Sequence, residues 1–117
     1  MISHFKDYLP LFEKAWSSQS SSLYTLANPA RGQCSVTAII LQEYCGGSIK
    51  KTRINDAWHY YNWINGKRVD LTCSQFQLLP QYTDTPSSLE EAWSDTNQEQ
   101  VEYLRQAIQK AKKEPTR

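Results

Sequence analysis

The sequence lacks long apolar runs and has few cysteines. None of its runs approaches the ~20 apolar residues that a membrane-spanning helix needs. The first residues, MISHFKDYLPLF, lack the charged and then apolar regions of a secretion signal. The 3 cysteines are too few and too widely spaced for a disulfide framework. These absences predict a cytoplasmic protein with reduced thiols and no membrane partner.

An excess of either charge is also missing. Lys and Arg total 13 against 12 Asp and Glu, which leaves a net charge of +1. The aromatic residues are not interleaved with basic clusters, as binding to single-stranded nucleic acid would require. The composition therefore gives no reason to expect nucleic acid as a partner. With 117 residues, 39% of them hydrophobic, the chain is expected to form a single domain over residues 1–117.

Hydrophobic periodicity predicts helices near both ends of the chain and one in the middle. An apolar stripe with helical spacing covers residues 5–16, where Pro10 is expected to kink the helix or delay its start. Residues 35–44 form a buried helix that ends at Gly46-Gly47. Residues 97–113 show one apolar face, which predicts an amphipathic terminal helix.

Strand patterns lie between the central and terminal helices. Residues 48–54 read as an edge strand, and residues 58–64 and 67–72 as a hairpin. Asn65-Gly66 between the last two is the strongest short-range hairpin signal. Possible capping boxes, Ser87 with Glu90 and Thr96 with Glu99, precede a short helix at 89–93 and the terminal helix. The pattern therefore predicts an α+β fold.

Cys34 directly precedes the buried central helix. The dipole and free N–H groups of a helix N-terminus stabilise a thiolate, which is the nucleophilic form of cysteine. Gly32 lets the chain turn sharply and a substrate approach closely. A small, buried, apolar cysteine is the alternative interpretation, and for Cys34 taken alone it is the more common one.

His59 and Asp70 lie on the two strands of the hairpin. With a two-residue turn, Trp63 pairs with Arg68 and Tyr61 with Asp70, and side chains alternate between faces with period two. His59 and Asp70 then become diagonal neighbours on one face, about 7–8 Å apart and within hydrogen-bonding reach. A bulged turn would put them on opposite faces. Structural roles, a hydrogen-bonded buried histidine and a strand-end aspartate, remain the alternative for each residue.

Two segments resemble known motifs. The segment RGQCSVTA at residues 31–38 resembles the nucleophile motif of transglutaminase-like domains, and WHYYNWINGKRVDLT at 58–72 resembles their paired His and Asp strands. The chain as a whole resembles the YunG-like family of small bacterial proteins. This resemblance implies a papain-like fold, in which the nucleophile helix packs on a small antiparallel sheet, with further helices at both ends.

The same resemblance implies a catalytic triad. Cys34 would be the nucleophile, His59 the general base and Asp70 the orienting acid. Asn28, six residues before Cys34, stands where papain-like proteases carry an oxyanion-binding Gln, and Gln33 is the rival donor. The expected reaction is acyl transfer from a peptide or protein amide to water or to an amine, without a cofactor.

Several assignments stay open at the sequence level. Trp58, Tyr61 and Trp63 are candidate walls of a substrate site, although such aromatics are more often core residues. A metal site built from Cys34, Cys45, Cys73 and His59 is disfavoured, because tight Cys-x₂₋₄-Cys pairs are missing. A non-catalytic binding module with the same fold is the alternative to an enzyme. The sequence does not indicate an oligomeric state.

Overall fold

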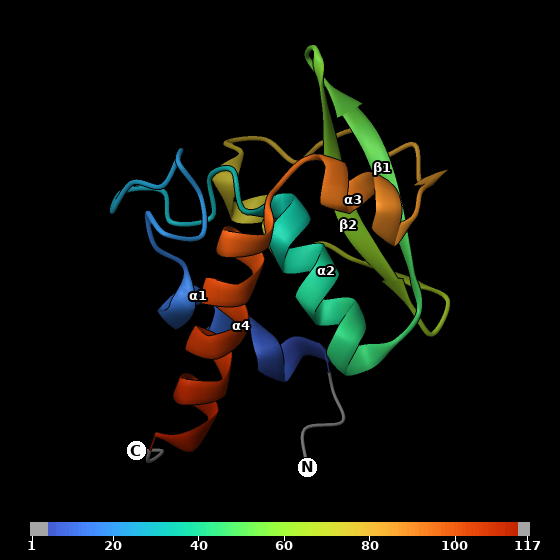
Figure 1. Ribbon diagram of the computed structural model, residues 1–117. Helices are drawn as coiled ribbons and strands as arrows, with labels where there is room; N and C mark the ends of the chain where they lie inside the picture. Colours follow the sequence, from blue (N-terminus) through green and yellow to red (C-terminus); the bar gives the residue numbers. More distant parts are fainter. Residues whose placement is uncertain (1–4, 115–117) are drawn as a thin grey trace.

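The computed structural model describes residues 5–114 as helices and an antiparallel sheet (Figure 1). The helical segments are η1 (Phe5–Tyr8), α1 (Leu9–Ala15), α2 (Cys34–Cys45), η2 (Cys73–Gln75), α3 (Leu89–Ser94) and α4 (Gln98–Lys113). The strands are β1 (Ser48–Ile54), β2 (Ala57–Ile64), β3 (Lys67–Val69) and β4 (Thr85–Pro86). The protein is therefore an α+β protein, as the sequence predicts.

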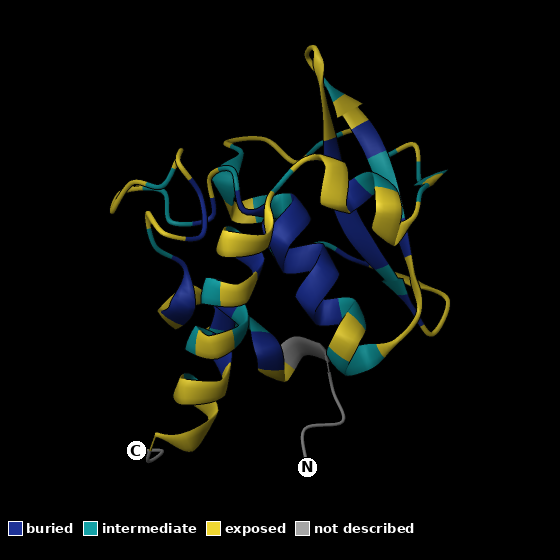
Figure 2. Cartoon of the chain, in the orientation of Figure 1, coloured by how far each residue is buried: buried dark blue, intermediate teal, exposed yellow. Residues whose placement is uncertain are grey.

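Helix α2 lies at the centre of the molecule, between the sheet and the other helices (Figure 1). Its residues from Ser35 to Leu41 are all buried, so this part of the helix has no solvent-exposed face (Figure 2). The side-chain amide of Asn62 on β2 donates to the carbonyl of Ala38 at 3.0 Å and joins the helix to the sheet. Helix α4 instead buries one face, through Val101, Leu104 and Ile108.

The sheet has the strand order β3-β2-β1-β4. Asn65 and Gly66 have φ of 53° and 76°, as a tight two-residue hairpin turn requires. The predicted pairing of Trp63 with Arg68 is confirmed. Strand β3 ends at Val69, however, so the predicted strand at 67–72 is too long and Tyr61 and Asp70 are not ladder partners.

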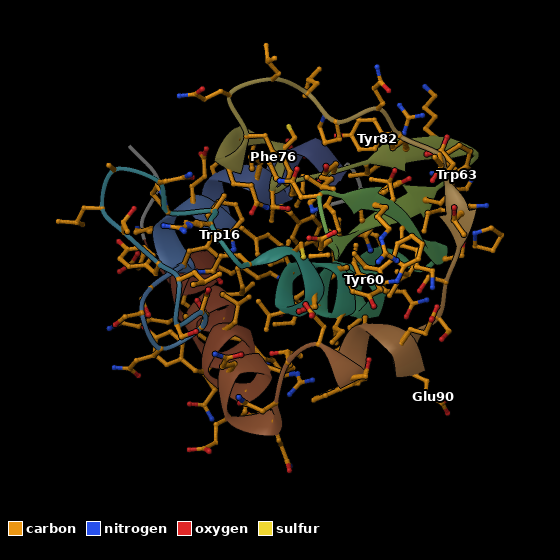
Figure 3. All side chains as sticks on the ribbon, turned by 90° about the horizontal axis from the view of Figure 1, so that it is seen from above. Trp16, Tyr60, Trp63, Phe76, Tyr82 and Glu90 are labelled. Atoms are coloured by element: carbon orange, nitrogen blue, oxygen red, sulfur yellow. The ribbon has the colours of Figure 1, made fainter. Side chains whose placement is uncertain are left out.

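The predicted edge position of β1 is also wrong, because the short strand β4 pairs with it at Lys50 and Lys51. The two faces of the sheet have different covers. Figure 3 shows Tyr60 on the side of α2, and Phe76 and Tyr82 on the other side. The chain between η2 and β4 therefore covers the sheet face that α2 leaves open.

Helix starts show where local signals compete. Pro10 stands in the first turn of α1, and a 3₁₀ turn precedes it, so proline delays the helix rather than kinking it. Ser88, not Ser87, caps α3 by accepting from the N–H of Glu91 at 3.1 Å. Asn97 caps α4 in the same way, so both predicted capping boxes are one residue early. In the part of the chain that the structure describes, no helix is long and apolar enough to span a bilayer.

Candidate active site

Cys34 is the first residue of α2 and is half-buried at the edge of the core. The turn before it depends on Gly32, whose φ is +73°. A Cβ at this position would come within 2.4 Å of Ser21 Oγ, so only glycine fits without rearrangement. The hydroxyl of Ser21 donates to the carbonyl of Arg31 at 3.0 Å and ties the two loops together. The sequence thus holds the cysteine at a helix N-terminus.

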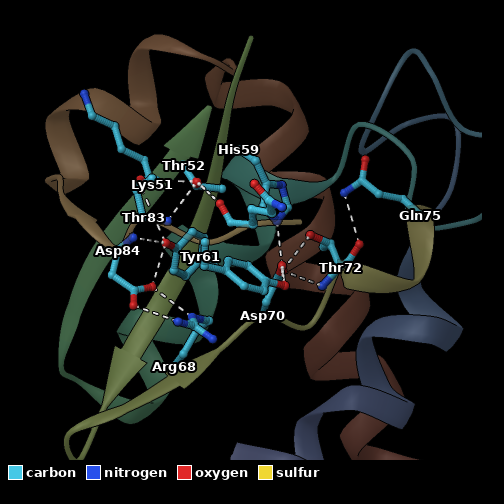
Figure 4. Close-up of polar contacts among 12 residues, drawn as sticks. Lys51, Thr52, His59, Tyr61, Arg68, Asp70, Thr72, Gln75, Thr83 and Asp84 are labelled. Carbon is cyan, nitrogen blue, oxygen red and sulfur yellow. Dashed lines mark hydrogen bonds and ion pairs between the residues drawn. The ribbon is translucent and has the colours of Figure 1, made fainter. Parts of the chain in front are cut away.

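His59 and Asp70 form the polar centre of the site (Figure 4). His59 Nε2 and Asp70 Oδ2 are 2.7 Å apart, and both side chains are buried, at 4% and 5% exposure. The predicted contact is therefore present, although Asp70 reaches His59 from just beyond the end of β3. Because Nε2 contacts Asp70, the other ring nitrogen, Nδ1, remains for a second partner.

Opposing effects determine the charge of His59. Burial lowers the pKa of the imidazole, because a charged ring loses its hydration. Hydrogen bonding and charge interaction with Asp70, and then with Cys34, raise this pKa more strongly. The net result is a pKa of about 9, so His59 is protonated at neutral pH.

Asp70 has more partners than His59 alone. Its Oδ1 accepts from the backbone N–H and the hydroxyl of Thr72, both at 3.2 Å. Its Oδ2 accepts a second hydrogen bond from the phenol of Tyr82 at 2.7 Å. Four donors therefore hold this buried carboxylate in one orientation, which leaves little freedom to the imidazole bound to it.

A pocket of about 360 Å³ opens beside Cys34 and His59. Its apolar wall consists of Leu23, Ile54, Trp58 and Phe76, and its polar lining includes Arg31, Gln75, Asp95 and Gln100. The ring of Phe76 stands edge-on to the imidazole, with centroids 4.9 Å apart. The cysteine thiol and the imidazole thus face a space large enough for part of a substrate side chain or backbone.

The two predicted oxyanion donors do not line this pocket. Asn28 Nδ2 donates to the backbone carbonyl of Gln75 at 3.0 Å and joins two loops. Gln33 is fully buried, and its Nε2 donates to the carbonyl of Ser17. Their positions in the sequence predict a donor beside the Cys34 sulfur. In the structure both side-chain amides instead donate to backbone carbonyls of distant segments.

The three residues predicted as walls of a substrate site occupy different places in the structure. Trp58 lines the pocket, with Lys51 Nζ 4.2 Å from its ring centroid. Tyr61 is only 1% exposed and stacks on His59, at a centroid distance of 5.8 Å, outside the pocket lining. Trp63 lies farther along β2 beside Lys50 and does not line the pocket either. Of the three candidate wall residues, only Trp58 therefore lines this pocket.

Sequence reasoning missed Tyr82, Phe76 and Gln75. All three lie in or next to the loop between η2 and β4, a segment without the periodicity that places side chains on a face. The order Asp70-x-Thr72 is a local signal for an aspartate side chain that accepts a hydrogen bond from the residue two positions later. No such local signal predicts the contact between Tyr82 and Asp70.

The other two cysteines, Cys45 and Cys73, do not line this pocket. Burial raises the pKa of both the Cys45 and the Cys73 thiol. Within residues 5–114, no cluster of three or more His, Cys, Asp or Glu side chains has the arrangement of a metal site.

Fold and site together define a class: a small α+β protein in which a cysteine and a histidine line one pocket and a buried aspartate contacts that histidine. The chain belongs to the YunG family, since residues 4–113 match the family described as YunG protein. It is 48% identical over 98 residues to the Bacillus subtilis (strain 168) protein described as "Uncharacterized protein YunG". That match covers 84% of this chain and 85% of the relative. No solved structure matches the chain.

Proposed function

We propose that the protein is a cysteine-dependent acyl-transfer enzyme with a papain-like arrangement, related to transglutaminase-like domains. One observation carries the proposal: Cys34, at a helix N-terminus, shares a pocket with an imidazole whose Nε2 is 2.7 Å from the buried carboxylate of Asp70. Each of these residues, taken alone, is common as a structural residue. Together they provide a nucleophile, a base and an orienting acid within one site.

The proposed reaction begins when the Cys34 sulfur attacks the carbonyl carbon of an amide. A C–S bond forms, and the carbonyl electron pair moves onto oxygen. The tetrahedral intermediate then collapses, and His59 Nδ1 donates its proton to the departing nitrogen as the C–N bond breaks. Asp70 keeps the imidazole oriented and stabilises its protonated form. Water or an amine then attacks the thioester carbon and gives a proton to His59 Nδ1, the C–S bond breaks, and Cys34 leaves as the thiolate while the acyl product is released.

The backbone N–H of Cys34 is the proposed donor to the oxyanion. It belongs to the first turn of α2, where N–H groups have no partner within the helix. The helix dipole adds to this stabilisation. This assignment replaces Asn28 and Gln33, whose amides are engaged elsewhere.

Alkylation by iodoacetamide tests the nucleophile. We expect Cys34 to react at pH 7 at least ~10-fold faster than Cys45 and Cys73, since an activated cysteine is thiolate-rich and burial disfavours the other two thiolates. Peptide mass spectrometry of the labelled chain gives the three rates separately. His59→Ala is expected to slow the alkylation of Cys34 and to leave the rates of Cys45 and Cys73 unchanged.

An acyl donor then separates a reactive thiol from an acyl-transfer enzyme. With p-nitrophenyl acetate, Cys34 should become S-acetylated and then lose the acetyl group to water in a step that requires His59. Cys34→Ala is the matched control. Equal alkylation of all three cysteines, or acetylation that never turns over, would favour a non-catalytic binding module.

A further inference from the structure

Tyr82 shares an oxygen of Asp70 with the candidate catalytic histidine. Its phenol donates to Asp70 Oδ2 at 2.7 Å, and His59 Nε2 lies 2.7 Å from the same oxygen. Thr72, by contrast, donates to Oδ1. The two donors to Oδ2 therefore compete for the charge of one atom.

The ring of Tyr82 is held in place independently of its hydroxyl. Arg68 Cζ lies 4.2 Å from the ring centroid, and the ring of Tyr61 meets it edge-on at 5.0 Å. Arg68 is itself fixed by hydrogen bonds to both carboxylate oxygens of Asp84, at 2.8 and 2.7 Å. Removing only the hydroxyl should therefore leave the ring in its present position.

Other titratable groups also act on this pair. Cys34, at the start of α2, lines the same pocket as His59 and raises the pKa of its imidazole, and Cys73 in η2 interacts electrostatically with Asp70 and Tyr82. Arg68, which is paired with Asp84, lies over the Tyr82 ring. None of these groups takes a hydrogen bond from the Tyr82 hydroxyl, so that hydroxyl can be changed alone.

We propose that Tyr82 is a positioning residue that limits how strongly Asp70 holds the protonated imidazole of His59. A carboxylate oxygen that already accepts a short hydrogen bond offers less negative charge to a second donor. The consequence is that His59 gives up its proton more readily, as the protonation of a leaving amine requires. This consequence rests on the proposed function, whereas the competition for Oδ2 does not.

The test is an NMR titration of the His59 Cε1–H signal. A His4→Gln background leaves His59 as the one imidazole, since the sequence has 2 histidines. In this background His59 should titrate with a pKa of about 9. Tyr82→Phe should raise that pKa by roughly half a unit to one unit, because Asp70 then directs more of its charge to the imidazolium.

Tyr61→Phe is the matched control. It also removes one phenol hydroxyl, in the ring next to Tyr82, but this hydroxyl donates to Asp84 at 2.9 Å and not to Asp70. We expect no change in the His59 pKa. Thr72→Val removes a donor from the other oxygen of Asp70 and should raise the pKa less than Tyr82→Phe does. It also provides the test if Tyr82→Phe does not fold.

A Tyr82→Phe protein whose His59 pKa equals that of Tyr61→Phe, or falls, would overturn the proposal and leave Tyr82 as a loop anchor. If p-nitrophenyl acetate turns over, the alkaline limit of its rate should move up in pH together with the NMR value. If it does not turn over, the proposed function fails, and the titration still decides the role of Tyr82.

Discussion

His59 keeps its proton although it is buried, and the reason lies in its immediate partners. A buried imidazole without a partner has a lowered pKa, because water no longer stabilises its charge. The contact with Asp70, at 2.7 Å, and the nearby thiol of Cys34 reverse this effect. The charge state of the site at neutral pH thus depends mainly on one carboxylate.

Asp70→Asn should therefore change the charge of the site. Without the carboxylate, burial dominates and the pKa of His59 is expected to fall from about 9 to below its ordinary value of about 6.5. An NMR titration of the imidazole measures this directly. Alkylation of Cys34 at pH 7 should slow by at least ~10-fold, because the neutral imidazole no longer stabilises a thiolate.

Asp84→Asn is the control for that substitution. Asp84 is also a hydrogen-bonded carboxylate beside the sheet, but its partners are Arg68 and Tyr61 rather than His59. Its loss should leave the pKa of His59 near 9. A His59 pKa that survives Asp70→Asn unchanged would assign its stabilisation to Cys34 instead.

At the scale of elements, the start of α2 depends on the turn that precedes it. Gly32→Ala should destabilise the protein in two ways. Its positive φ of +73° costs about 1–3 kcal/mol for a residue with a Cβ. The new Cβ would also meet Ser21 Oγ at 2.4 Å and Leu23 Cβ at 3.0 Å, which overpacks the loop at a further cost of about 1–3 kcal/mol.

Gly46→Ala separates these two contributions. Gly46 has a φ of +74°, but nothing lies within 4 Å of a Cβ built on it. Urea denaturation should show Gly32→Ala to be less stable than Gly46→Ala by about 1–3 kcal/mol, the cost of overpacking. Equal losses would mean that the 21–23 loop moves aside freely.

The elements predicted best from sequence are those set by adjacent residues. Asn65-Gly66 specifies a tight turn, and the turn specifies the register that puts His59 and Asp70 on one side of the hairpin. Helix caps were misplaced by one residue, since Ser87 and Ser88 both suit a cap and packing chooses between them. Strand β3 stops at Val69, and the Asp70 carboxylate beyond it accepts from the backbone N–H of Thr72 in a local turn instead of a ladder.

At the scale of the molecule, the unpredicted parts of the site come from contacts between distant segments. The amide of Asn28 bonds a carbonyl 47 residues away, and the phenol of Tyr82 reaches Asp70 from a loop without periodic pattern. Packing of α2 on β2 brings Cys34 to His59, and the sequence contains no local signal for that. The contact between His59 and Asp70 could be predicted from the hairpin, whereas the pocket lining depends on tertiary structure.

The same imidazole links the stability of the whole molecule to pH. The pKa of His59 is raised from about 6.5 in the unfolded chain to about 9 in the folded protein. A group with a raised folded pKa contributes stability that is fully present below pH 6.5 and is lost as the pH rises through 9. At about 1.4 kcal/mol per pKa unit, the free energy of unfolding should fall by on the order of 3 kcal/mol across this window.

Urea denaturation at a series of pH values measures this fall, with His59→Gln as the reference. The thiols of Cys45 and Cys73 also ionise in the unfolded chain near the top of the window, and burial disfavours their thiolates in the fold. Their contribution is common to both proteins, so the difference between the two curves reports His59 together with the Cys34 thiol that interacts with it. Parallel curves between pH 6.5 and 9 would mean that the imidazolium gains nothing from folding, and Asp70 would then be only a structural carboxylate.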